Sequence, residues 1–151
     1  MLAHNALLRA LLGRSLAPGS SFIRYLFQDP LARERIVNWA DFAAASVGGL
    51  RLELGREPDD AVLVALIDEL RATDPDVARW WDDHGVRDHT SVPKRIAHPT
   101  AGELHFDIEI VVAPHDPAQR LVVYTTQRDS PTARVLPLLA SWDVDAPVPG
   151  S

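Results

Sequence analysis

The chain has 151 residues, of which 46% are hydrophobic and 24% are charged, with a net charge of −6 and no cysteine. These values are ordinary for one folded domain, and they exclude disulfides, thiolate metal sites and thiol nucleophiles. An acidic surface repels phosphate backbones, so the composition disfavours direct binding to nucleic acid. The sequence has no apolar run long enough to span a bilayer and no recognisable signal peptide, so we expect a cytoplasmic chain.

The first half of the chain carries the start and stop signals of several helices. Leu2–His4 suits a shortened first strand, and the helix that follows from Asn5 to Leu12 is expected to end at Gly13. After a loop rich in Gly, Pro and Ser, a second short helix covers Phe22–Gln28. Helices therefore come first in this chain, and strands come later.

The longest predicted helix runs from Pro30 to Leu54. Asp29 supplies an N-cap, and proline suits the first helical position because its missing N–H needs no partner there. The apolar residues recur at intervals of three or four and predict one buried stripe, made of Ile36, Ala40, Ala43, Val47, Leu50 and Leu54. Gly48-Gly49 should weaken or bend the middle of this helix, and Gly55 should end it.

Two further helices are predicted before the main strands begin. Pro58–Asp60 caps the first of them, and Asp74-Pro75 caps the second, which should end at Gly85. The first is expected to bury Leu63, Leu66, Ile67 and Leu70, and the second carries Val77, Trp80, Trp81 and His84.

The second half of the chain is dominated by strand patterns. Ser91–Ala97 is predicted as a strand, and Glu103–Ile110 alternates strictly between polar and apolar residues, which is typical of a strand with one buried face. The apolar face carries Leu104, Phe106, Ile108 and Ile110, and the wet face carries Glu103, His105, Asp107 and Glu109. A polar connection over Ala113–Gln119 leads to an antiparallel strand over Leu121–Thr126. The elements together predict an α+β fold.

The last helix opens at Ser130-Pro131, with Ser130 as N-cap and Pro131 at the first helical position. Pro137 falls inside this helix, where it removes a hydrogen bond to Ala133 and costs about 3 kcal/mol if the helix continues undistorted. We therefore expect a kink or an early end there. The Pro-rich segment 143–151 is predicted to be a disordered tail.

Several blocks of sequence, in order and at consistent spacing, resemble one known family. They are RYLFQDPLARERIVNWADFAAASVGGLRLELGREPDD, DPDVARWWDDHGVR, GEL, DPAQRLVVYT, SP and LLASW. These blocks resemble the C-terminal ligand-binding domain of MmyB-like transcription regulators, which are helix-turn-helix repressors of the xenobiotic-response-element type. The resemblance covers nearly all of Asn5–Trp142 and implies one domain over residues 1–142, with a PAS-like antiparallel sheet covered by several helices. It also implies that the helix-turn-helix DNA-binding domain, which precedes this point in the family, is not present in this chain.

Known catalytic motifs are absent from the sequence. It contains no G-x-S-x-G nucleophile elbow, no phosphate-binding P-loop, no G-x-G-x-x-G fingerprint and no H-E-x-x-H helix. The six histidines match no zinc pattern. A helix dipole explains the carboxylate pair Asp59-Asp60, and solvation explains Asp82-Asp83. We therefore expect no enzyme activity, no metal and no cofactor. The family resemblance implies a bound fatty acid as effector.

Aromatic residues from three predicted helices and two strands could converge between a sheet and its helical cover. They are Phe22, Tyr25, Phe27, Trp39, Phe42, Trp80, Trp81, Phe106 and Tyr124. One interpretation is a solid aromatic core. The other, which the family resemblance favours, is an apolar pocket for a fatty acid or a similar small molecule. The residues expected to line that pocket are Arg24, Leu26, Phe27, Trp39, Phe42, Trp80, Phe106, Ile108 and Tyr124.

Arg24 is the polar member of this set and lies within the apolar segment Phe22–Phe27. Its guanidinium matches a ligand carboxylate, because the two groups can form paired hydrogen bonds. The alternative role is a structural ion pair with Asp29 or Asp107. The sequence leaves both roles open.

Three other side chains receive little or no functional weight. His84 and His98 fall where the family also tends to have histidine, and the alternative for each is a local hydrogen bond. Lys94 is the only lysine of the chain, and we assign it no functional role.

Three classes of function remain open. The leading one is the ligand-sensing domain of a bacterial transcription regulator, which binds a fatty acid and modulates DNA binding by a separate helix-turn-helix module. The alternative is a dimerisation or partner-binding module whose pocket is filled by its own side chains. An unrecognised small hydrolase or lyase is the least favoured class. We expect no membrane partner, and if Leu2–His4 is a shortened strand, the exposed sheet edge favours homodimers.

Overall fold

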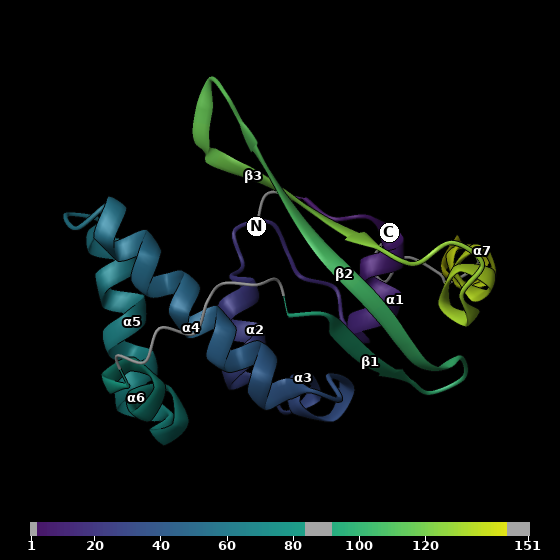
Figure 1. Ribbon diagram of the computed structural model, residues 1–151, viewed down its shortest axis with the longest axis horizontal. Coiled ribbons are helices and arrows are strands. Elements are labelled where there is room, and N and C mark those ends of the chain that lie inside the picture. Colours follow the sequence, from purple (N-terminus) through teal and green to yellow (C-terminus); the bar gives the residue numbers. More distant parts are fainter. Residues whose placement is uncertain (1–2, 84–91, 145–151) are drawn as a thin grey trace. The chain divides into compact units, whose positions relative to one another are not determined.

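The computed structural model describes residues 3–83 and 92–144. Within these residues the chain forms seven helices and a three-stranded antiparallel sheet, so the predicted α+β class is confirmed (Figure 1). The chain divides into two compact units: Met1–Val37 with Pro93–Ser151 form unit 1, and Asn38–Val92 form unit 2. Unit 1 holds the sheet, whereas unit 2 is helical. The PAS-like arrangement remains a prediction.

Unit 1 begins with three short helices, α1 (Ala6–Leu12), α2 (Phe22–Gln28) and α3 (Pro30–Arg35). A polar side chain caps each one, because Asn5, Ser21 and Asp29 accept hydrogen bonds from backbone N–H groups of the first turn. Gly13 ends α1 with a φ of 71°, a conformation that glycine adopts without strain. The predicted boundaries of α1 and α2 are therefore confirmed.

The first strand expected at Leu2–His4 does not form where the structure describes it. Leu2 lies outside the described residues, and Ala3 and His4 are not in a strand. The His4 ring instead contacts the backbone of Leu16, with 3.0 Å between Nε2 and the carbonyl oxygen. The structure therefore gives no support for a sheet edge at this place. The prediction of homodimers that rested on this edge loses its support as well.

The sheet contains β1 (Lys94–His98), β2 (Gly102–Ala113) and β3 (Asp116–Thr125), in that order. β1 pairs with the first half of β2, with Lys94 opposite Phe106. β3 pairs with the second half of β2, with Tyr124 opposite Ile108. The antiparallel pairing was predicted, but the polar connection expected over Ala113–Gln119 is reduced to a tight turn because β3 begins earlier than expected.

The core of unit 1 forms where α1 and α7 (Pro131–Val144) pack against the sheet. Its buried members, each at most 2% exposed, are Leu11 of α1, Ile96 of β1, Leu104 and Phe106 of β2, and Leu139 of α7. Burying an aliphatic or aromatic side chain of this size stabilises a fold by about 1.5–3 kcal/mol. Apolar contacts therefore hold both helices on one face of the sheet.

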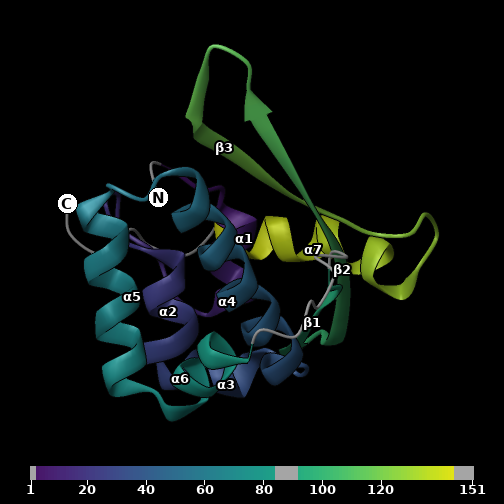
Figure 2. The same ribbon diagram turned by 60° about the vertical axis from the view of Figure 1, so that its left-hand side comes forward.

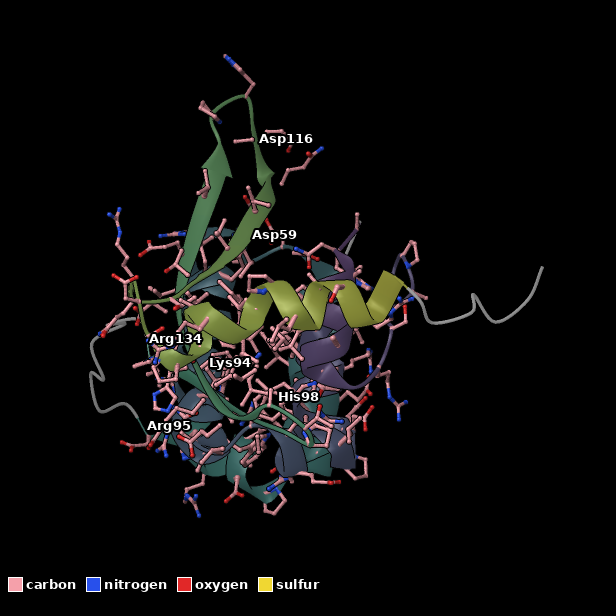
Figure 3. All side chains as sticks on the ribbon, turned by 90° about the vertical axis from the view of Figure 1, so that its right-hand side faces the viewer. Asp59, Lys94, Arg95, His98, Asp116 and Arg134 are labelled. Atoms are coloured by element: carbon pink, nitrogen blue, oxygen red, sulfur yellow. The ribbon has the colours of Figure 1, made fainter. Side chains whose placement is uncertain are left out.

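The alternation predicted for β2 holds at one end of the strand only. Leu104 and Phe106 are buried, and the four residues expected on the wet face are exposed. Ile108 is half-buried, but Ile110 is 59% exposed, so its placement on the buried face was wrong. The second half of β2 pairs with β3 in a hairpin that reaches away from α1 and α7, with Asp116 near its tip (Figures 1 and 3). Residues 107–125 form this hairpin arm.

Unit 2 consists of α4 (Trp39–Arg56), α5 (Ala61–Thr73) and α6 (Pro75–Asp82). α6 contacts both other helices (Figure 2). Asp60 and Asp74 cap α5 and α6, as predicted. The most buried apolar residues are Trp39, Ala43, Val47, Ile67, Leu70 and Val77. The predictions for His84, Gly85 and Ser91 fall outside the described residues.

The single long helix predicted from Pro30 to Leu54 is in fact two helices. Between them, Ile36 forms a β-bridge with Ile96, and the Val37 N–H donates to the Arg95 carbonyl at 2.8 Å. Pairing with β1 thus replaces helical hydrogen bonds at this point. Helical propensity cannot report such a break, because the competing partner is distant in sequence.

Two details of α4 also differ from expectation. The helix runs through Gly48-Gly49 without interruption and ends at Arg56 rather than at Gly55. Ala43 and Val47 of the predicted stripe are buried, but Ala40 is exposed. The stripe is therefore narrower than the spacing predicted.

The early end considered at Pro137 does not occur, because α7 continues to Val144. Leu139 lies two residues beyond the proline and is 1% exposed in the core of unit 1. Burial of this side chain offsets the hydrogen bond that Pro137 removes. Ser130 caps α7 as predicted, since its Oγ accepts from the Ala133 N–H at 3.1 Å.

Candidate functional site

A lysine side chain is buried in the core of unit 1. Lys94 is 0% exposed, and its Nζ donates a hydrogen bond to the Tyr124 hydroxyl at 2.8 Å. The same nitrogen lies 4.3 Å from the ring centre of Phe22 and 5.1 Å from that of Tyr124. Ring faces attract cations, so both contacts suit an ammonium. Lys94, Phe22 and Tyr124 together form the lysine site.

Strand geometry explains why Lys94 points inward. Side chains alternate along β1, so Lys94 shares a face with the buried Ile96, and Arg95 occupies the opposite face. Arg95 pairs with Glu103 at the surface, with 2.6 Å between Nε and Oε1. Figure 3 shows Lys94 among the crowded interior side chains and Arg95 toward the outside. The strand therefore directs the amine into the core.

Two more aromatic side chains extend the lysine site. The Phe106 ring lies 5.7 Å from that of Tyr124, and the Tyr25 ring lies 5.8 Å from that of Phe22. The Tyr25 hydroxyl donates to the Leu12 carbonyl at 3.0 Å. Aromatic side chains from α2, β2 and β3 thus gather around the one lysine.

Burial shifts the pKa values of this region toward the neutral forms. It lowers the pKa of Lys94 to about 7. Burial, followed by the nearby Asp29 carboxylate, raises the pKa of Tyr25 to about 12, and burial raises the pKa of Tyr124. Both phenols therefore keep their protons near neutral pH, where the charge of Lys94 changes.

An open groove of about 500 Å³ lies at the start of α2. Arg14, Ser21, Arg24, Tyr25, Gln28 and Asp29 are among the residues that line it. Asp29 pairs with Arg14, with 2.9 Å between Oδ2 and Nε. Of the nine residues expected to line a ligand pocket, only Arg24 borders this groove. The groove is open to solvent, whereas a pocket for a fatty acid encloses most of its ligand.

Two further findings concern metals and membranes. Residues 3–83 and 92–144 contain no group of three or more His, Asp or Glu side chains arranged to hold a metal ion. In the same described residues, no helix has the length and apolar character needed to cross a bilayer.

Comparison with known protein families identifies the chain. The family model of the MmyB-like transcription regulator ligand binding domain matches residues 1–139. The chain belongs to this family. The sequence resemblance is thereby confirmed, and the family is one of regulator domains rather than of enzymes. No curated protein and no solved structure matches the chain.

The residues expected to line a pocket in this MmyB-like domain fall in both units. Unit 1 holds Arg24, Leu26, Phe27, Phe106, Ile108 and Tyr124, and unit 2 holds Trp39, Phe42 and Trp80. In unit 1, Leu26, Phe27 and Phe106 are buried, whereas Arg24 is exposed. Phe106 and Tyr124 are brought into ring contact. The role of the nine residues in ligand binding remains a prediction.

Two of the expected residues meet in unit 2 of the MmyB-like domain. The ring centres of Trp39 and Trp80 lie 5.9 Å apart. Arg79 lies over the Trp80 ring at 5.6 Å, and Phe42 is half-buried. On α4, Arg51 donates to the backbone carbonyls of Trp80, Trp81 and Asp83 and so satisfies the end of α6. These contacts join α4 to α6.

Sequence reasoning missed the lysine site of this MmyB-like domain. Lys94 was given no role, because the sequence marked it only as the single lysine of the chain. One signal was available: the alternation that buries Ile96 also places Lys94 on the buried face of β1. For His98, a local hydrogen bond was the alternative to a functional role. This hydrogen bond is observed, since Nδ1 of His98 accepts from the Ala101 N–H at 3.1 Å.

Proposed function

We propose that this chain is the ligand-sensing domain of a bacterial transcription regulator and binds a fatty acid or a similar apolar molecule. The observation that carries the proposal is the family match over residues 1–139. The aromatic side chains around Lys94 support it, because apolar ligands bind among such side chains with a few polar groups. Ligand binding then modulates DNA binding in the cytoplasm through a separate helix-turn-helix module.

Apolar contact should supply most of the affinity. Each methylene of an acyl chain that leaves water contributes about 0.8 kcal/mol before ordering costs are subtracted. Affinity should therefore rise with chain length within a series of saturated fatty acids. The length at which this rise stops measures the apolar space available.

Native mass spectrometry of freshly purified protein, followed by denaturing extraction, tests the proposal directly. We expect a co-purified lipid, and calorimetry with octanoic to hexadecanoic acid should show affinity increasing with chain length. A protein that carries no lipid and binds no member of the series would contradict the proposal.

The hairpin arm favours a second function, dimerisation. Five large apolar residues on it are exposed, namely Ile110 at 59%, Val111 at 54%, Val112 at 47%, Leu121 at 63% and Val122 at 52%. They occupy both faces of the ribbon, since Ile110 lies opposite Val122 and the next residue, Val111, lies opposite Leu121. An isolated two-stranded hairpin is marginally stable in water, and monomers seldom expose large apolar patches.

We propose a second copy of this chain as the partner of the hairpin arm. The outer edge of β3 pairs with no further strand of the described sheet, so its backbone groups can pair with another arm. Two identical arms are self-complementary, as the interface of a symmetric dimer requires. Antiparallel pairing of the arms would also cover apolar residues that one copy leaves exposed.

Sedimentation across micromolar concentrations tests this arrangement. Wild-type protein should be dimeric. Leu121→Lys should be monomeric, because it places a charge in the apolar contact between the two arms. Leu138→Lys is the matched control, since Leu138 of α7 is similarly exposed at 54% but lies away from the arm. A monomeric wild-type protein, or equal loss of dimer in both variants, would rule out the arm as the contact.

A further inference from the structure

The lysine site places two hydrogen-bonding groups side by side in the core. The Nζ of Lys94 and the hydroxyl of Tyr124 lie 2.8 Å apart. The Phe22 ring lies 4.3 Å from Nζ and is itself only half-buried. A ligand group that displaced this ring from Nζ would meet an amine and a phenol together.

The surroundings of Nζ as a whole favour its uncharged form. Taking an ammonium out of water is costly, and the ring faces of Phe22 and Tyr124 offset part of that cost. Burial nevertheless lowers the pKa of Lys94 to about 7. A negatively charged group beside Nζ would raise the pKa of Lys94 again and favour the ammonium form. Opposite charges attract each other strongly in surroundings of low polarity.

We propose that Lys94 and Tyr124 bind the carboxylate head group of an acidic amphiphile. This inference rests on the proposed function and specifies its ligand as an apolar chain that ends in an anion. The Lys94 ammonium donates to one carboxylate oxygen, and the Tyr124 hydroxyl donates to the other. A carboxylate can accept both hydrogen bonds and neutralise the ammonium, whereas an alcohol with the same chain carries no charge.

Arg24 is the weaker candidate for the same head group. It is exposed and lies on the open groove. A carboxylate bound there stays in water, where solvent and salt screen the attraction. At Lys94 the pair forms away from water and is stronger. The preference for an acid over an alcohol should therefore depend on Lys94 and not on Arg24.

The other ionisable groups of this part of unit 1 keep one charge state above neutral pH. Tyr124 accepts a hydrogen bond from Nζ, Tyr25 contacts the Phe22 ring, and Arg35 lies close enough to Tyr25 and His98 to shift their pKa values. Burial raises the pKa of both tyrosines, to about 12 for Tyr25. Burial, followed by Arg35, lowers the pKa of His98, so this ring is neutral, and a guanidinium is always charged. Lys94 is therefore the member of this set that loses its charge.

Calorimetry with dodecanoic acid and 1-dodecanol tests the proposal, because the two ligands differ only in the head group. At about pH 7 the wild-type protein should bind the acid roughly 10-fold to 100-fold more tightly than the alcohol, as expected for charge-assisted hydrogen bonds. Lys94→Met should bring this ratio to about one by removing the charge. Arg24→Met is the matched control and should leave the ratio unchanged.

The pH profile of the wild-type protein gives a second readout that needs no variant. Free Lys94 loses its proton above about pH 7, so acid binding must restore it and should weaken by up to about tenfold per pH unit. Binding of 1-dodecanol should not change with pH. Calorimetry in buffers of different ionisation enthalpy should show that the protein takes up a proton when it binds dodecanoic acid and takes up none when it binds 1-dodecanol.

Each result decides between the two levels of the hypothesis. Equal binding of acid and alcohol by the wild-type protein would overturn the lysine anchor and leave the proposed lipid sensor standing. The lysine anchor would also be overturned if Lys94→Met kept the preference for the acid over the alcohol, or if Arg24→Met lost it. If the wild-type protein binds neither ligand, both the anchor and the proposed function fail.

Discussion

The Nζ of Lys94 donates a hydrogen bond to the Tyr124 hydroxyl, 2.8 Å away, inside the core of unit 1. The two residues come from β1 and β3, which do not pair with each other, so this contact spans the width of the sheet. It places the only lysine of the chain in a region that favours its neutral form. The stability of the protein should therefore depend on the protonation of this one amine.

Replacing Lys94 by methionine should abolish a rise of stability with pH. Burial lowers the pKa of Lys94 from 10.5 to about 7, so between these values the unfolded chain holds a proton that the folded chain has lost. The wild-type free energy of unfolding should therefore rise by up to roughly 5 kcal/mol as the pH rises through this window. Below the window the full cost of burying the charged amine should apply. Urea unfolding at several pH values measures the difference between the two proteins.

Arg95→Met is the control for that experiment. Arg95 is the next residue on β1, but its side chain is at the surface, so the variant should keep the wild-type pH slope. Identical slopes for wild-type protein and Lys94→Met would show that the amine is solvated in the folded state.

Gly13→Ala should destabilise the protein by about 1–2 kcal/mol, because φ at this position is positive and the end of α1 requires it. An added Cβ would also lie 2.8 Å from Nη2 of Arg35. Gly49→Ala makes the same chemical change inside α4 with nothing within 4 Å of the new Cβ. It should stabilise by about 0.5–1 kcal/mol. Thermal unfolding of both variants checks the opposite signs, and two shifts of the same sign would contradict the expectation.

Ala43→Phe distinguishes a packed interior from a hollow one in unit 2. Ala43 is 0% exposed, so the larger ring should overpack its surroundings and destabilise by about 1–3 kcal/mol. Ala40→Phe, three residues earlier on an exposed position of α4, should change stability little. If Ala43→Phe kept full stability but lost affinity for fatty acids, the space beside it would be a ligand cavity instead.

The chain alone should not bind DNA specifically. Its net charge is −6, and the stretch most like a helix-turn-helix, residues 59–81, is acidic. Mobility-shift assays at low salt should show no sequence-specific retardation. Salt-sensitive retardation that depends on the DNA sequence would refute the prediction.

Local chemistry made much of this fold predictable. The cap residues Asn5, Asp60, Asp74 and Ser130 each start a helix because their side chains accept hydrogen bonds from N–H groups two or three residues away. The alternation along β2 correctly separated Leu104 and Phe106 from the wet face. Ordered blocks of sequence also identified the family. None of these conclusions needs a contact between distant residues.

The tertiary structure alone decided the features that depend on distant partners. Pairing of Ile36 with Ile96 divides the longest predicted helix, and burial of Leu139 carries α7 past Pro137. Ile110 is exposed because it lies on the hairpin arm, which reaches away from α1 and α7. Lys94 is buried because Phe22 and Tyr124, from elements far along the chain, close around it. Packing between such segments is absent from any local pattern, since propensity and periodicity record only near neighbours.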